Sequence, residues 1–340
     1  MTDYVFENFN PEMEVLGDID CELIPYQCKT AAELAEKAND ADALLNTYLS
    51  GIDGDVLDAM PHLKVIVRYG IGYNTIDIDA ASARGIQVAN VPDYCLDEVS
   101  DHAVAMTLGL VRKITLSDNR VRGGDYSLAY LNPVLPLRGA KTGIIGFGRI
   151  GKLIAAKLSV FGCQVIYYDP FVKSGNDCDS AAESVSLDDL YADSDVILVQ
   201  APATDETYHI LDKAAFAKMK RKPYVINCAR GELVDENALV NALKVGTISG
   251  AGLDVVESMP PVQKDNPLLG FDNVILTPHS AWVSRNSYVE LQRLAAMEVA
   301  RVLKGGVVKS LLNPDYISER ERGGTVGIDS ENLIGSRLHG

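Results

Sequence analysis

The sequence lacks the features of membrane, secreted and metal-binding proteins. No apolar run approaches the roughly 20 residues that a membrane-spanning helix needs. The first fifteen residues are acidic and lack the positively charged region of a secretion signal. The six cysteines are scattered, without a CxxC pair or any other metal-ligand spacing. We therefore expect a cytoplasmic protein with reduced thiols, no metal site and no membrane partner.

Positive charge is also scarce. The 31 lysines and arginines face 47 aspartates and glutamates, which gives a formal net charge of −16. Such a surface repels phosphate backbones, so nucleic acid is not an expected partner. Hydrophobic residues make up 47% of the 340 residues, enough for a sizeable core, and the length suggests two domains.

Short apolar runs rich in valine and isoleucine alternate with amphipathic stretches of helical length. Continuous apolar runs are typical of parallel strands that are covered on both faces. The runs occupy residues 41–46, 63–70, 85–91, 141–148, 163–169, 195–202, 224–230, 248–255 and 273–279. This alternation predicts an α/β fold with doubly wound parallel sheets.

A glycine-rich turn follows the strand-like run TGII. Gly146, Gly148 and Gly151 have GxGxxG spacing, and Arg149 and Ile150 open the helix-like stretch RIGKLIAAKL. In a dinucleotide-binding turn the first glycine permits the tight bend, the second lets the backbone approach the pyrophosphate, and the third lets helix and strand pack closely. The helix N-terminus then offers N–H groups to the phosphates. The turn therefore predicts a bound dinucleotide.

An acidic residue completes this pattern. Asp169 ends the next apolar run, QVIYY, where a carboxylate accepts hydrogen bonds from the ribose hydroxyls and repels a 2′-phosphate. Pro170 and Phe171 follow it, in place of the arginine that usually accommodates NADP. The expected cofactor is therefore NAD.

We expect two doubly wound domains, a Rossmann NAD-binding domain inserted in a flavodoxin-like substrate-binding domain. The substrate-binding domain begins with residues 1–98 and ends with residues 286–318, and the NAD-binding domain takes residues 99–285. One long helix is predicted over about 98–122. The polar, glycine-rich tail at 319–340 is expected to be mobile.

The sequence resembles the D-isomer-specific 2-hydroxyacid dehydrogenases over residues 40–312. The motifs that carry the resemblance are KVIVRYGIGYNTIDI, GIQVANVPDYCLDEVSDHAVAMTLGL, TGIIGFGRIG, VINCARGELVDENALVNAL, GLDVVE and NVILTPHSAW. VPDYCLDEVSDHA and TPHSAWVS are most similar to the C-terminal-binding-protein branch, which includes NAD(H)-binding transcriptional corepressors as well as bacterial relatives presumed to be enzymes.

The resemblance implies hydride transfer between NAD(H) and C2 of a small 2-oxo or D-2-hydroxy acid. Arg230 would hold the substrate carboxylate, since a guanidinium fork matches a carboxylate and stays charged. His279 would exchange a proton with the carbonyl oxygen. Asp254 would face the nicotinamide carboxamide. The alternative interpretations, without the resemblance, are that Arg230 is a surface arginine that caps a strand end and that His279 is a structural histidine.

Further positions follow from the same resemblance. The expected cofactor-binding set also contains Ala201, Pro202, Thr207, Cys228, Ala229, Arg230, Asp254 and His279. The expected substrate loop contains Tyr69, Gly70, Ile71 and Gly72. Trp282 is either core or a wall of the substrate pocket, and Cys228 is interpreted as a small packing residue because no base lies beside it in the sequence. The other four histidines do not stand at the end of an apolar strand as His279 does. The resemblance also implies that the protein is a homodimer.

One catalytic position departs from the family pattern. A glutamate that pairs with the histidine is expected where this chain has Met259, followed by Pro260. Without that carboxylate His279 is less basic, and reduction should favour lower pH. Three hypotheses stay open: Arg230 and His279 work alone, Glu257 replaces the missing partner, or the protein is an NAD(H)-binding regulator with weak or no turnover.

Overall fold

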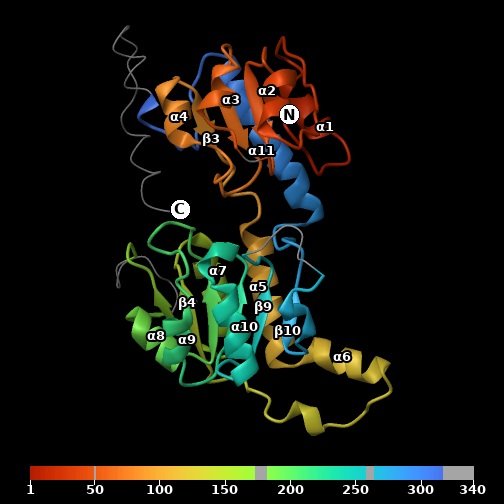
Figure 1. Ribbon diagram of the computed structural model, residues 1–340, viewed down its shortest axis with the longest axis vertical. Coiled ribbons are helices and arrows are strands. Elements are labelled where there is room, and N and C mark those ends of the chain that lie inside the picture. Colours follow the sequence, from red (N-terminus) through yellow and green to blue (C-terminus); the bar gives the residue numbers. More distant parts are fainter. Residues whose placement is uncertain (50, 173–181, 258–263, 317–340) are drawn as a thin grey trace. The chain divides into compact units, whose positions relative to one another are not determined.

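The computed structural model describes residues 1–49, 51–172, 182–257 and 264–316 (Figure 1). The described residues form two compact units, one made of Met1–Cys95 and the stretch Val283–Tyr316, and one made of Leu96–Trp282. Met259 and the tail at 319–340 lie outside the described residues. None of the helices in the described part of the chain combines the length and apolar character of a membrane span.

The unit Leu96–Trp282 is built on a parallel seven-stranded sheet. Its strands are β4 (Lys141–Ile145), β5 (Gln164–Tyr168), β6 (Glu183–Ser184), β7 (Val196–Val199), β8 (Tyr224–Asn227), β9 (Gly250–Leu253) and β10 (Val274–Leu276). Their order is β10-β9-β8-β7-β4-β5-β6. The chain runs outward from β4 to β6 and then returns to β7 on the other side of β4. This order of parallel strands confirms the predicted Rossmann architecture. Ligands of such sheets bind outside the carboxyl ends of the strands, at the point where the strand order reverses.

Helices cover this sheet because each parallel connection must cross over it. They are α5 (Leu96–Val111), α7 (Arg149–Val160), α8 (Leu187–Asp193), α9 (Lys213–Lys218) and α10 (Glu236–Val245). Helix α6 (Ile114–Arg122) follows α5 and has no buried residue. Helices α5 and α7 pack against each other, and α9 packs against both α8 and α10. Right-handed crossovers that leave β4 in opposite directions place these groups on opposite faces. Every residue of β7, β8 and β9 is buried, as continuous apolar runs predict.

Two details of the unit Leu96–Trp282 differ from the sequence-based expectation. The single helix expected over 98–122 is two helices, because Lys113 adopts a left-handed conformation (φ 53°) that breaks the helical hydrogen bonding between α5 and α6. Strand β6 was not predicted. It has only two residues, both exposed, so it leaves no apolar run in the sequence.

The other unit contains the parallel strands β1 (Ala43–Asn46), β2 (Val65–Arg68) and β3 (Gln87–Ala89), in that order. Backbone hydrogen bonds extend the sheet beyond β1, from Thr2 N to Leu45 O (2.9 Å) and from Cys28 N to Thr2 O (3.0 Å). The extended order is that of a flavodoxin-like sheet, with the second segment at the edge. The helices are α1 (Asn10–Leu16), α2 (Ala31–Lys37), α3 (Gly54–Asp58), α4 (Ile78–Ala83) and α11 (Arg285–Leu303).

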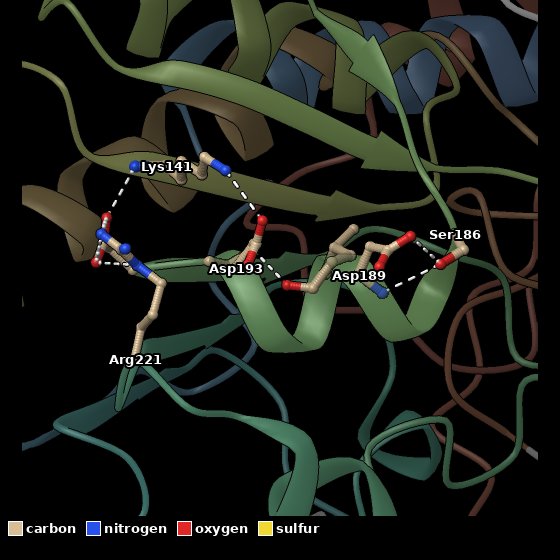
Figure 2. A network of polar contacts seen from close by, with 8 residues as sticks. Lys141, Ser186, Asp189, Asp193 and Arg221 are labelled. Atoms are coloured by element: carbon tan, nitrogen blue, oxygen red, sulfur yellow. Dashed lines mark hydrogen bonds and ion pairs between the residues drawn. The ribbon is translucent and has the colours of Figure 1, made fainter.

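A polar network connects the amino ends of strands in the unit Leu96–Trp282 (Figure 2). Asp195, only 7% exposed, accepts a hydrogen bond from Lys141 N (2.9 Å) and two from the Arg221 guanidinium (2.9 Å each). Lys141 Nζ also reaches Asp193 Oδ2 at 3.0 Å. The guanidinium compensates the buried carboxylate in bidentate geometry. This edge is therefore occupied by structural ion pairs, while the opposite, carboxyl edge carries the glycine turn.

Candidate functional site

The glycine turn joins β4 to α7, and its three glycines serve different needs. Gly146 has φ +89°, and a Cβ there would lie 2.7 Å from the carbonyl carbon and oxygen of Gln200. A Cβ on Gly151 would overlap the carbonyl oxygen of Gly146. A Cβ on Gly148 would meet nothing within 4 Å, so the fold itself does not require this glycine. The open space above Gly148 fits the close approach of a ligand phosphate.

The start of α7 adds an electrostatic contribution to this turn. Gly148 is the N-cap residue, and among the described residues no side chain caps this twelve-residue helix. The first-turn amides and the positive end of the helix dipole are thus directed at the space beside the turn. Backbone donors at a helix N-terminus suit a pyrophosphate, so the residues present fit a dinucleotide.

Asp169 lies against the same turn, directly after β5. Its Oδ2 accepts a hydrogen bond from Phe147 N at 2.7 Å, and its Oδ1 accepts one from Phe171 N at 2.9 Å. These amides fix the carboxylate beside Gly146 and Gly148. Oδ1 also accepts a hydrogen bond from Val172 N at 3.2 Å, so three of about four acceptor positions are used and one is left for a ribose hydroxyl.

Ala201, Pro202 and Thr207 lie in the loop after β7. Thr207 Oγ1 donates a hydrogen bond to Pro202 O at 2.6 Å and accepts one from Thr204 N at 2.8 Å. The hydroxyl therefore closes the loop onto itself. This loop lies next to the glycine turn, where the strand order reverses between β4 and β7. The backbone of Gln200 is so close to Gly146 that a Cβ there would lie 2.7 Å from its carbonyl group.

A buried amide shapes the loop that carries Arg230. Asn227 Nδ2 donates to Arg230 O at 2.8 Å, and Asn227 Oδ1 accepts from Ala229 N at 3.0 Å. The half-buried Arg230 donates from Nη1 to Ala229 O at 2.7 Å. A Cβ on Gly231 would overlap Val256 O, so the residue after Arg230 must be glycine for the two loops to pack.

Cys228 lies in this loop but is not exposed for chemistry. Its Sγ is 3.9 Å from Met106 Sδ, and burial raises the pKa of the thiol well above its usual range. A thiol of this kind stays protonated and unreactive. Its surroundings are those of a packing residue.

Asp254, 1% exposed, organises the loop after β10. Its Oδ1 accepts hydrogen bonds from the Thr277 hydroxyl (2.5 Å) and from Ser280 N (2.8 Å). Its Oδ2 accepts one from Ala281 N (2.9 Å). Three donors from one five-residue stretch thus converge on a single carboxylate, which we call the Asp254 hub (Asp254, Thr277, Ser280 and Ala281).

His279 lies within the loop that the Asp254 hub holds. It has φ +54°, a conformation that costs a non-glycine residue of the order of 1 kcal/mol. Its backbone N–H donates to Asp254 O at 2.9 Å. The hydrogen bonds of Ser280 N and Ala281 N to Asp254 compensate this local strain. They also fix the backbone from which the half-buried His279 side chain extends. Trp282, the next large residue, is buried.

Two histidines that the sequence did not single out take part in these loops. His102, on α5, places Nε2 3.0 Å from Thr277 Oγ1 and 3.7 Å from Asp254 Oδ1. His209 Nε2 is 2.6 Å from Glu257 Oε1, and the Tyr208 ring stacks on His209. Both pairs join residues far apart in the chain, so no local pattern predicts them.

The Glu257 contact bears on the missing carboxylate. Glu257 Oε1 binds His209, and Glu257 Oε2 accepts a weak hydrogen bond from Glu236 N at 3.4 Å. The hypothesis that Glu257 replaces the partner of His279 is therefore not supported by its position. Met259, which stands at the family's glutamate position, lies outside the described residues.

In the other unit, the loop Tyr69–Gly72 follows β2. Gly70 has φ +127°, and its carbonyl accepts from Val91 N (3.1 Å), while Ile71 O accepts from Asn90 Nδ2 (2.6 Å). The amides of Gly70, Ile71 and Gly72 donate to no acceptor within the described residues. With its carbonyls bound and successive amides available, this loop is suited to an anion.

Comparison with known proteins identifies the family. Residues 104–281 match the NAD binding domain of the D-isomer specific 2-hydroxyacid dehydrogenases. A glyoxylate reductase of Thermofilum pendens is 37% identical over 311 residues, covering 88% of this chain and 91% of that protein. A D-3-phosphoglycerate dehydrogenase of Archaeoglobus fulgidus is 37% identical over 281 residues, covering 83% of this chain and 53% of that protein.

A solved structure shows the same architecture. The glyoxylate reductase from Paecilomyes thermophila superposes with a TM-score of 0.82 at 27% identity, covering 92% of this chain and 96% of that chain. The relatives named here support the family and its NAD-binding domain, while the C-terminal-binding-protein branch stays a prediction. NAD is the cofactor that the glycine turn serves. This chain belongs to the D-isomer specific 2-hydroxyacid dehydrogenase family.

Proposed function

We propose that this protein is an NAD-dependent oxidoreductase that interconverts a small 2-oxo acid and a D-2-hydroxy acid. The observation that carries the proposal is the order of the strands. Arg230 follows β8, Asp254 follows β9 and His279 follows β10, and these three strands are neighbours in the sheet whose β4 leads into the glycine turn. A cation, a buried carboxylate and an imidazole thus come from adjacent carboxyl ends on one edge.

The roles of the side chains follow from their chemistry. Bound NAD(H) supplies or accepts the hydride. Arg230 holds the carboxylate of the 2-oxo acid and polarises its carbonyl group, because a guanidinium stays charged and donates in fork geometry. His279 donates a proton to the carbonyl oxygen during reduction and takes it back during oxidation.

Glyoxylate is the first substrate to test, because glyoxylate reductases are among the most similar relatives. Steady-state NADH oxidation should be measured with 2-oxo acids from glyoxylate to phenylpyruvate and phosphohydroxypyruvate. We expect turnover with at least one of them. Glycolate, the product from glyoxylate, has no stereocentre, so the D configuration should be tested by chiral analysis of the products from larger 2-oxo acids. Absence of turnover throughout, with tight NADH binding retained, would instead favour a C-terminal-binding-protein-like regulator.

Met259 determines the expected pH dependence. Glu257 Oε1 is bound to His209. A methionine at the family's glutamate position adds no carboxylate that would favour the protonated form of His279, so reduction should accelerate as the pH falls. Met259→Glu should shift the limb on which reduction slows with rising pH to higher pH, whereas Met259→Gln, which adds no charge, should not. An unshifted profile in Met259→Glu would contradict this account.

We also propose a homodimer that uses the arm formed by α6 and the segment after it. None of the nine residues of α6 is buried, and Tyr126 and Leu128 are 79% and 74% exposed. Figure 1 shows α6 extending away from the sheet of its own unit. Apolar side chains exposed in this number favour a protein partner. Light scattering should give the mass of a dimer for the native chain and of a monomer for Tyr126→Glu/Leu128→Glu.

A further inference from the structure

We infer that His102 is a positioning residue for the loop that carries His279. The inference depends on the proposed function for its catalytic consequence, but its structural part does not. His102 lies on α5, whereas Thr277 and Asp254 follow β10 and β9. Its Nε2 is 3.0 Å from Thr277 Oγ1, so α5 contacts the Asp254 hub through one polar contact.

The proton positions in this chain follow from the donor count. A threonine hydroxyl has one proton, and Thr277 Oγ1 lies 2.5 Å from Asp254 Oδ1, which as a carboxylate can only accept. Thr277 therefore donates to Asp254, and its oxygen must accept from His102. His102 consequently carries a proton on Nε2. The order of donation is His102 to Thr277 to Asp254.

This order of donation explains how a residue that follows no catalytic strand affects the site. The N–H of His102 holds the Thr277 hydroxyl in the rotamer that points at Asp254. Asp254 Oδ1 also accepts from Ser280 N and Oδ2 accepts from Ala281 N, the two amides that follow His279. Because His279 is held in a left-handed conformation, loosening of this hub should let the residue relax to an ordinary conformation and move its ring.

The first experiment reads the loop without any substrate or cofactor. Amide hydrogen exchange should be compared between the native chain and the variants His102→Leu, His102→Gln, Thr277→Val and Thr277→Ser. Leucine and valine remove the polar contact, while glutamine and serine retain a donor or hydroxyl at nearly the same place. We expect at least tenfold faster exchange at Ser280 and Ala281 in His102→Leu and Thr277→Val, near-native exchange in the other two, and unchanged exchange in α7.

The second experiment measures the catalytic consequence with the best 2-oxo acid. We expect His102→Leu and Thr277→Val to lower kcat about tenfold, with the Kd for NADH within twofold of the native value. His102→Gln and Thr277→Ser should keep kcat within threefold. A general loss of packing would slow the glutamine and leucine variants alike and lower their Tm together, and that result would overturn the inference.

The two proposals fail in different ways. If the native chain turns over no 2-oxo acid, the proposed function fails, but the exchange at Ser280 and Ala281 still decides the role of His102. If exchange there is the same in the native chain and in His102→Leu, the positioning role is wrong even for an active enzyme. The ¹⁵N chemical shifts of His102 provide a further check, because a proton absent from Nε2 would contradict the assigned order of donation.

Discussion

Replacement of Asp254 by asparagine should release the loop that carries His279. The asparagine side chain has the same shape but only one accepting oxygen. If that oxygen faces Thr277 and Ser280, the amide nitrogen faces Ala281 N–H, donor against donor, and that hydrogen bond is lost. A hydrogen bond to a charged acceptor contributes about 1.5–3 kcal/mol and a neutral one about 1 kcal/mol, so one lost and two weakened bonds amount to about 3 kcal/mol.

The assay is amide exchange at Ser280 and Ala281 in the apo protein. Where exchange follows the local opening equilibrium, a loss of about 3 kcal/mol corresponds to roughly 100-fold faster exchange. Asp272→Asn is the matched control, because this carboxylate is 75% exposed and its ion pair with Arg120 spans 3.5 Å. Such a surface pair contributes little, so exchange should stay native. Exchange within threefold of native in Asp254→Asn would refute the hub as the support of the loop.

The remaining predictions concern the cofactor turn and a buried carboxyl. Gly151→Ala should lower the Tm, because its Cβ would overlap the carbonyl oxygen of Gly146. Gly148→Ala should leave the Tm unchanged and raise the Kd for NADH about tenfold. Equal Tm values for the two variants would contradict this distinction. Asp169→Gly should raise the ratio of kcat/KM for NADPH to that for NADH at least tenfold, as measured by steady-state kinetics, and an unchanged ratio would argue against its contact with the ribose. Burial raises the pKa of Glu12, so the stability that this carboxyl contributes is full at low pH and falls as the pH rises through its folded pKa. Thermal unfolding across pH should therefore be flatter for Glu12→Gln, while the exposed Glu14→Gln should follow the native curve.

The strands and the cofactor turn were predictable because their causes are local. Each of the nine predicted apolar runs contains a strand, and the glycine spacing reflects the steric needs of one turn. The break at Lys113 was not predictable, because a left-handed lysine between two amphipathic segments leaves no trace in the hydrophobic pattern. Strand β6 was missed because its two exposed residues have no periodicity.

Sequence motifs pointed to the residues of the candidate site, but the contacts among these residues could not be predicted from the sequence. Arg230, Asp254 and His279 each stand in a recognisable motif, but the Asp254 hub joins side chain and backbone groups more than twenty residues apart. The contact of His102 with Thr277 spans 175 positions and depends on how α5 packs on the sheet. Glu257 was one hypothesis for the missing partner of His279, yet its Oε1 lies against His209 Nε2, on a separate loop.

The order of the strands divides the candidate site into two groups of residues within one sheet. The glycine turn and Asp169 follow β4 and β5, whereas Arg230, Asp254 and His279 follow β8, β9 and β10, with β7 between the two groups. In the proposed function, a substitution in the second group therefore affects the contacts of the substrate and the nicotinamide without altering the steric needs of the turn. Met259 belongs to the same stretch of sequence as the second group, after β9. The replacement of a glutamate there is thus expected to change turnover and its pH dependence while NAD binding persists, and for this reason the enzyme and regulator hypotheses must be distinguished by turnover, not by affinity for NADH.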